Sequence, residues 1–597
     1  MTRTLRAAAA ASLLVPAPAQ GQAPELAAAV RGAVTVQALE RHAREITRHV
    51  RPSGSPGENA ATDYVVAALR AAGVPVEVHE FRAYTSNPVS ARVTVPGTDF
   101  APDAITLSFS GVTPGVEALL VDLGDLEDLP GLEMGTGERL ALLGGEALPH
   151  VRGRIALVTG QPRNVPATVL EELGAVAVIF VNPEERLNEL IVTSTWGTPS
   201  LLNAHRLNGL PVAQIRRSDG DRLRGMIAAR EVRARVETVV DTGWKPLRLA
   251  VARVMPQDVT AETSWVLFGG HIDAWHHGGT DEGAANAAML ELALAFHANR
   301  DRMRRGLVVA WWPGHSNARY GGSTWFADHF FEELRTRAVA YVNVDGIGQT
   351  GASVFGATAS PALEALGRSV LRKATEADVR VGRPGRNSDE SFNGIGLPLL
   401  QLNHSRANAD GGTWWWHTAD DTYDKIDMQV LKTDTDLYAE ALSRLVTHPS
   451  AQVSLQAEAE RLRTALADRL GESGGRLDLA EADEAAGRLG ALVASSSERL
   501  ERAPGSPELD RLVLDVVRPI HRVMFSPGSD HHPDPGIYDD PLPGLEPASI
   551  LATEDPASDR YGFALAYLLR ERNRVLEATS EAIQAAERLT TFLGIRW

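Results

Sequence analysis

Histidine and aspartate side chains recur where apolar runs of this chain end. His271 and Asp273 directly follow a run closed by two glycines, and Asp345 closes a second run. His417 lies in a polar loop further along the chain. Imidazoles and carboxylates are ligands that zinc takes in proteins. These positions therefore predict a metal site.

Asp281 is the fourth candidate ligand, because it precedes a stretch of small residues, 283–292, that predicts a helix start. A helix N-terminus favours a nearby anion, which suits a carboxylate shared by two cations. The apolar residues 264–270 predict a buried parallel strand, and ligands of such sheets lie beyond the carboxyl ends of the strands. One His-x-Asp pair is a weak signal, whereas the ordered set of four ligands is far more specific.

Other residues near these motifs have simpler interpretations. His276 and His277 are expected at the rim of the loop, and His404 in a pocket or in the core. The tryptophans 414–416 are expected to pack or to form a pocket wall. None of these residues is needed for the predicted metal site.

The ligand motifs resemble those of the co-catalytic zinc peptidases, which include bacterial aminopeptidases, carboxypeptidase Q, glutamate carboxypeptidase and the non-enzymatic transferrin receptor. Both end motifs match, at residues 270–275 and 417–427. The resemblance implies a Zn²⁺ cofactor, one or two ions per chain.

The same resemblance assigns a role to each ligand. His271 and Asp345 would hold one metal, His417 would hold the other, and Asp281 would bridge the two. The carboxylate of Asp273 would orient His271, since metal-bound imidazoles usually have such a partner.

The chain departs from the family because the usual Glu-Glu pair, a general base followed by a ligand, is missing. Counting back from Gly322 places the pair on Ser316 and Asn317. A missing general base costs about 10²–10⁴ in rate. His315 is the main candidate replacement, as ligand or base, and a hydrogen bond within the loop is the alternative. The other candidate bases are Glu282, Asp389 and Glu390.

Composition restricts the class of protein. The chain has 597 residues, which predicts several domains, and no cysteine, which excludes thiol catalysis and thiolate zinc sites. Its net charge of -17 argues against nucleic-acid binding. Residues 1–19 have the pattern of a cleavable export signal, and no later segment predicts a membrane span. A periplasmic or secreted protein is expected.

The predicted fold is α/β, with a doubly wound, mostly parallel sheet. Residues 24–100 and 242–448 are expected to form the catalytic domain. Residues 101–241 are expected to be a β-rich insertion that resembles the protease-associated domain. This insertion would either control access of the substrate to the active site or serve as a passive spacer. Residues 449–597 predict a helical domain, and larger family members use such a domain to form dimers.

Three hypotheses on function remain open. The first is a zinc-dependent exopeptidase, aminopeptidase-like, that hydrolyses small peptides outside the cytoplasm. The second is a peptidase-like binding protein without activity, which the missing Glu-Glu pair favours. Retention of the four ligands argues against it, because clustered buried carboxylates are costly without a cation. The third is a hydrolase of a non-peptide amide.

Overall fold

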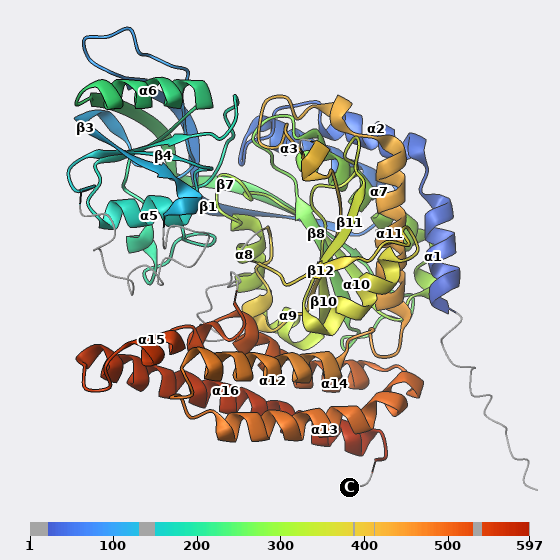
Figure 1. Ribbon diagram of the computed structural model, residues 1–597. Helices are drawn as coiled ribbons and strands as arrows, with labels where there is room; N and C mark the ends of the chain where they lie inside the picture. Colours follow the sequence, from blue (N-terminus) through green and yellow to red (C-terminus); the bar gives the residue numbers. More distant parts are fainter. Residues whose placement is uncertain (1–21, 130–149, 386–387, 411, 529–539, 596–597) are drawn as a thin grey trace, which may run out of the picture.

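The computed structural model describes residues 22–129, 150–385, 388–410, 412–528 and 540–595. Figure 1 shows a central α/β part, a smaller α/β insertion beside it, and a layer of helices below. The predicted export signal, residues 1–19, lies outside the described residues, as do His531 and His532. Among the described helices, none is both long and apolar enough to cross a membrane.

The central sheet confirms the predicted mostly parallel α/β fold. Its middle strands run parallel in the order β13-β10-β8-β9. Strands β8, β9 and β10 are buried along their whole length, which explains why their sequences are continuous apolar runs. The strands of this sheet are β7 (Arg233–Val254), β8 (Trp265–His271), β9 (Gly306–Trp312), β10 (Ala338–Asn343), β11 (Val354–Ala359), β12 (Arg380–Gly382) and β13 (Leu399–Ser405).

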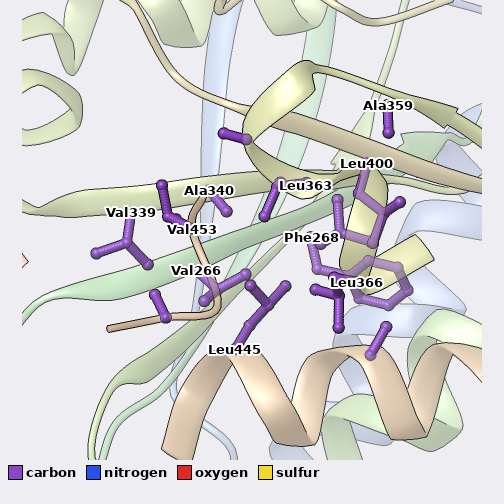
Figure 2. Close-up of a cluster of buried hydrophobic side chains, with 14 of the residues drawn as sticks. Val266, Phe268, Val339, Ala340, Ala359, Leu363, Leu366, Leu400, Leu445 and Val453 are labelled. Carbon is purple, nitrogen blue, oxygen red and sulfur yellow. The ribbon is translucent and has the colours of Figure 1, made fainter. Parts of the chain in front are cut away.

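Helices cover both faces of this sheet, as a doubly wound fold requires. Alternate residues of β8 face opposite cores: Val266 and Phe268 lie in one cluster, and Trp265 and Leu267 in the other. Figure 2 shows part of the first cluster, where Leu445 lies near Val266. The covering helices are α1 (Gln22–Ala33), α2 (Val36–Ile46), α3 (Pro56–Ala71), α7 (Ala284–Ala298), α8 (Gly321–His329), α9 (Phe331–Arg337), α10 (Glu364–Leu371) and α11 (Met428–Thr447).

The insertion is joined to the central sheet by two long strands. β1 (Val76–Thr94) pairs antiparallel with β7 from Val76↔Ala252 to Thr94↔Arg235. The boundary expected at 241/242 falls inside β7, so the two parts of the molecule share a continuous strand. The insertion contains β2 (Ile105–Thr106), β3 (Thr113–Asp125), β4 (Ile155–Thr159), α5 (Asn164–Glu172), β5 (Ala177–Val181), β6 (Val212–Ile215) and α6 (Arg217–Ala229).

The C-terminal region is helical, as predicted. It contains α12 (Leu455–Glu472), α13 (Ala480–Arg502), α14 (Pro507–Phe525), α15 (Ala548–Thr553) and α16 (Asp559–Phe592). A buried ion pair fastens it to the central part: Asp510 of α14 accepts hydrogen bonds from Arg304 at 2.6 Å and from Arg305, just before β9. Helix α14 has a clear start signal, because Ser506 caps it and Pro507 occupies its first turn.

Candidate metal centre

The sheet brings the predicted ligands to one edge. His271 is the last residue of β8, and Asp345 lies two residues beyond β10. His315 lies three residues beyond β9. Because these strands are adjacent and parallel, their carboxyl ends meet at the same edge of the sheet. His417 reaches this edge from the loop that follows β13.

Asp281 lies between two histidines, in the turn Gly279–Gly283 ahead of α7. One carboxylate oxygen, Oδ1, is 3.6 Å from Nε2 of His271. The other, Oδ2, is 3.7 Å from Nε2 of His417. Ligand atoms of His271, His315 and Asp345 all lie within 4.8 Å of one another. The structure therefore brings together all four predicted ligands and the predicted replacement residue.

A hydrogen bond between Nδ1 and an oxygen atom fixes each of the three histidines of the centre, His271, His315 and His417. The acceptors are the carbonyl of Asp273 for His271, at 2.7 Å, and the carbonyl of Glu189 for His417, at 2.6 Å. Nδ1 of His315 is 2.8 Å from Oδ2 of Asp389. A carbonyl can only accept, so Nδ1 is the donor and Nε2 is the nitrogen left to bind a metal.

Asp273 supports the site differently from the expectation. Its backbone carbonyl, and not its carboxylate, holds His271; the nearest carboxylate oxygen is 3.8 Å from Nδ1. The buried carboxylate instead accepts hydrogen bonds from the backbone N–H groups of His315 and Ser316, both at 3.0 Å, and from the Ser53 hydroxyl at 2.6 Å. Asp273 thus shapes the loop that carries His315, because two of these three donors are backbone N–H groups of that loop.

Asp421 and Arg51 support the site, although sequence reasoning gave them no role. Asp421 accepts from the backbone N–H groups of Thr280, at 2.9 Å, and of Asp281, at 3.0 Å. The buried guanidinium of Arg51 donates to the carbonyls of Ile272, at 3.0 Å, and Gly278, at 3.2 Å. The signal for Asp421 was its place in the 417–427 motif, whereas Arg51 stood only in a Pro/Gly-rich turn.

Two of the remaining candidate bases, Glu282 and Glu390, are buried carboxylates whose pKa values are raised. Glu282 is fully buried, and its Oε1 accepts from Gly346 N–H at 2.8 Å. Burial and the Asp345 carboxylate raise the pKa of Glu282 well above its ordinary value. Burial, followed by Asp345 and Asp389, does the same to the pKa of Glu390. Both environments disfavour the charged form that a base needs.

The electrostatics of the centre favour a cation. Burial alone would lower the pKa of His271, but Asp281, Asp345 and Asp273 outweigh it and raise the pKa to about 10. Burial lowers the pKa of His417 to about 4. Burial and Asp281 raise the pKa of Asp421 to about 7. The centre therefore has a surplus of carboxylate charge, which a divalent ion would neutralise.

The donor set fits zinc. Nε2 of His271 is buried and has no hydrogen-bond partner, and the same holds for Oε2 of Glu282. Orphaned buried polar atoms of this kind call for an explanation such as a bound ion. Two imidazoles with two carboxylates at the edge of a sheet match the nitrogen and oxygen ligands that zinc prefers.

The insertion takes part in the centre. Glu189 holds His417 through the carbonyl already described and through its own N–H, which donates to the His417 carbonyl at 3.0 Å. Asn188 donates to the carbonyl of Trp416 at 2.7 Å, and Trp196 donates to Ser391 at 3.0 Å. Trp416 itself stacks on the His417 ring, which agrees with the wall role expected for it.

A parallel α/β sheet with imidazoles and carboxylates at the carboxyl ends of adjacent strands defines an α/β protein with a candidate metal site beyond the strand ends. Residues 251–442 match the family model of Peptidase family M28. This match confirms the resemblance found in the sequence over these residues.

Individual relatives agree with this assignment. The "Probable lipoprotein aminopeptidase LpqL" of Mycobacterium tuberculosis is 25% identical over 442 residues, which cover 69% of this chain and 83% of that protein. Transferrin receptor protein 2 of Homo sapiens is 27% identical over 205 residues, 30% of this chain and 25% of that protein.

Solved structures share the fold. The aminopeptidase from Aneurinibacillus sp. strain AM-1 has a TM-score of 0.54 at 21% identity, covering 70% of this chain and 95% of that chain. A zinc aminopeptidase from Bacillus subtilis has a TM-score of 0.51 at 19% identity, covering 69% of this chain and 94% of that chain. The chain therefore shares the fold of these aminopeptidases.

Proposed function

We propose that this protein is an extracytoplasmic zinc-dependent metallopeptidase, an aminopeptidase-like exopeptidase that hydrolyses small peptides. The observation that carries the proposal is the position of Asp281, with one carboxylate oxygen 3.6 Å from His271 and the other 3.7 Å from His417. The match to Peptidase family M28 supports the hydrolase class, and the relatives named above support aminopeptidase action.

His271, Asp281, Asp345 and His417 would hold the metal. When bound, zinc lowers the pKa of a water molecule and polarises the carbonyl of the scissile bond. The chain itself fixes the imidazoles through their Nδ1 atoms and buries Asp281, whereas Asp345 is half-buried. The loop 188–197 of the insertion contacts the loop that carries His417, and it is the part of the insertion suited to control access of a peptide.

Two alternatives have support. A binding protein without activity is favoured by the missing Glu-Glu pair and by the similarity to transferrin receptor protein 2. A hydrolase of non-peptide amides would use the same ligands with a different pocket. The buried, unpartnered Nε2 of His271 favours retention of a metal and so favours either hydrolase over the binding protein.

Other parts of the proposal rest on composition. The net charge of -17 supports a protein that does not bind nucleic acid, and the pattern of residues 1–19 supports export. The five helices α12 to α16 are the surface proposed for a homodimer, and the mass of the protein in solution tests this.

The test is hydrolysis of a panel of aminoacyl p-nitroanilides and dipeptides, each with a free or an acetylated N-terminus. We expect turnover of the free amines that is lost on chelation and restored by zinc. His271→Ala should abolish turnover, whereas His329→Ala, which changes an exposed histidine of α8, should not. Metal binding without turnover of any peptide would refute the peptidase, and turnover of simple amides alone would favour the second hydrolase.

A further inference from the structure

We propose that His315 is a metal ligand, held in place by Asp389, and that it binds the ion shared by His271 and Asp345. The centre would then hold one ion tightly instead of two. This inference rests on the proposal that the centre binds zinc, but it does not depend on which bond is hydrolysed.

The proximity of three potential ligand atoms, from His271, His315 and Asp345, carries the inference. The rings of His271 and His315 stack with their centroids 3.8 Å apart and their planes at 17°. Among the described residues, His271, His315 and Asp345 are the set of potential ligands whose binding atoms all lie within 4.8 Å of one another. Two histidines and a carboxylate are the three protein ligands found in many catalytic zinc sites.

The hydrogen bonds of His315 are those of a metal-bound histidine. Nδ1 contacts Asp389 at 2.8 Å, which leaves Nε2 for the ion. Asp389 is itself fully buried, and its second oxygen accepts from the Ser323 hydroxyl at 2.7 Å. A histidine between a metal and a hydrogen-bonded carboxylate is the usual arrangement around zinc, because the carboxylate fixes the ring and raises its basicity.

Within the described part of the chain, the side of the centre near His417 has no group of three potential ligands. His417 and Asp281 face each other there, at 3.7 Å. Asn317, which stands at one of the two positions of the missing Glu-Glu pair, is turned away from it. Its Oδ1 accepts from Ser53 N–H at 3.1 Å, and its amide nitrogen donates to the Ser86 carbonyl at 3.4 Å. Since zinc sites in proteins ordinarily use at least three protein ligands, two are too few for a second tightly bound ion.

The position of His315 explains how the chain compensates for the lost glutamates. His315 comes from the same loop after β9 in which they are missing, but its ring lies against His271 and not against His417. The replacement therefore does not restore the ligand of the second ion. It strengthens the site of the first ion, and it exchanges a negative ligand for a neutral one.

The experiment measures zinc bound to the full chain by equilibrium dialysis, with affinity from competition against a chromophoric chelator. We expect one ion per chain in the wild type and in the control His329→Ala. His315→Ala should lose the ion at the same free zinc concentration, and Asp389→Asn should bind it about 10–100-fold more weakly. Cobalt substitution gives a second readout, since a lost imidazole shifts the visible absorption bands.

Two outcomes would overturn the inference. One is two tightly bound ions in the wild type, and the other is wild-type affinity and wild-type cobalt spectrum in His315→Ala. If His315→Ala does not fold, as judged by circular dichroism, Asp389→Asn and His315→Gln decide the question by the same measurements. One bound ion without any hydrolysis would support the inference while refuting the proposed function, so the two failures are distinguishable.

Discussion

Replacing Asp421 by asparagine should weaken metal binding without touching a proposed ligand. Oδ1 of Asp421 accepts from the N–H of Thr280 at 2.9 Å and from its hydroxyl at 3.1 Å. Oδ2 accepts from Asp281 N–H at 3.0 Å. Asparagine has one acceptor oxygen and one NH₂ group, so it can replace only one of these two acceptor oxygens. If the oxygen stays with Thr280, the NH₂ group meets the N–H of Asp281, donor against donor.

The size of the expected change in zinc affinity follows from the hydrogen bond that is lost. A hydrogen bond to a charged group contributes about 1.5–3 kcal/mol. Part of this energy holds the Asp281 backbone in place, and loss of groups that orient metal ligands typically lowers affinity about 10–100-fold. A tenfold change corresponds to about 1.4 kcal/mol, so the two scales agree. We therefore expect the zinc dissociation constant of Asp421→Asn to rise about 10–100-fold.

The assay is competition for zinc against a chromophoric chelator at about pH 8.5, where Asp421, with its pKa of about 7, is charged. Asp420→Asn is the matched control, because it makes the same chemical change at the adjacent, exposed position. The variant should fold, since Asp421→Asn is nearly isosteric, and circular dichroism checks this. Zinc affinity equal to that of the control would refute the reasoning that Asp421 positions Asp281.

Two further predictions concern buried charges outside the ligand set. Asp510→Ala leaves the fully buried Arg305 without its carboxylate, and should lower the free energy of unfolding by about 3–5 kcal/mol in urea denaturation. Burial raises the pKa of Asp510, but Arg305 and Arg304 outweigh it and hold the pKa below its ordinary value. The stability from this pair is therefore present above the unfolded pKa of about 3.9 and is lost as the pH falls through the lower folded pKa. The wild type should lose more stability than the variant on acidification below about pH 4; equal losses would contradict this. Arg51→Met removes the donors that hold the carbonyls of the loop after β8, and should weaken zinc binding about tenfold, by analogy with other groups that orient ligands. Arg48→Met, an exposed change in the same segment, is its control, and equal zinc affinity in the two variants would count against the role of Arg51.

The sequence was sufficient for the fold class and for the residues that meet at the edge of the sheet. Continuous apolar runs predicted buried parallel strands, because both faces of β8, β9 and β10 pack against helices. Once parallel strands are adjacent, residues at their carboxyl ends must meet, so His271 and Asp345 could be predicted as neighbours. The order of motifs along the chain added Asp281 and His417 and pointed to the family.

The tertiary structure decided which atoms hold those ligands. Asp389 lies 74 positions from His315, and Glu189 lies 228 positions from His417, within the insertion. The sequence also suggested the carboxylate of Asp273 as the partner of His271, where the structure uses its carbonyl. Motif spacing reports on strand ends and turns, whereas the partner of each imidazole nitrogen depends on how distant loops pack. For this reason residue types could be predicted from the sequence, and the hydrogen bonds that orient them could not.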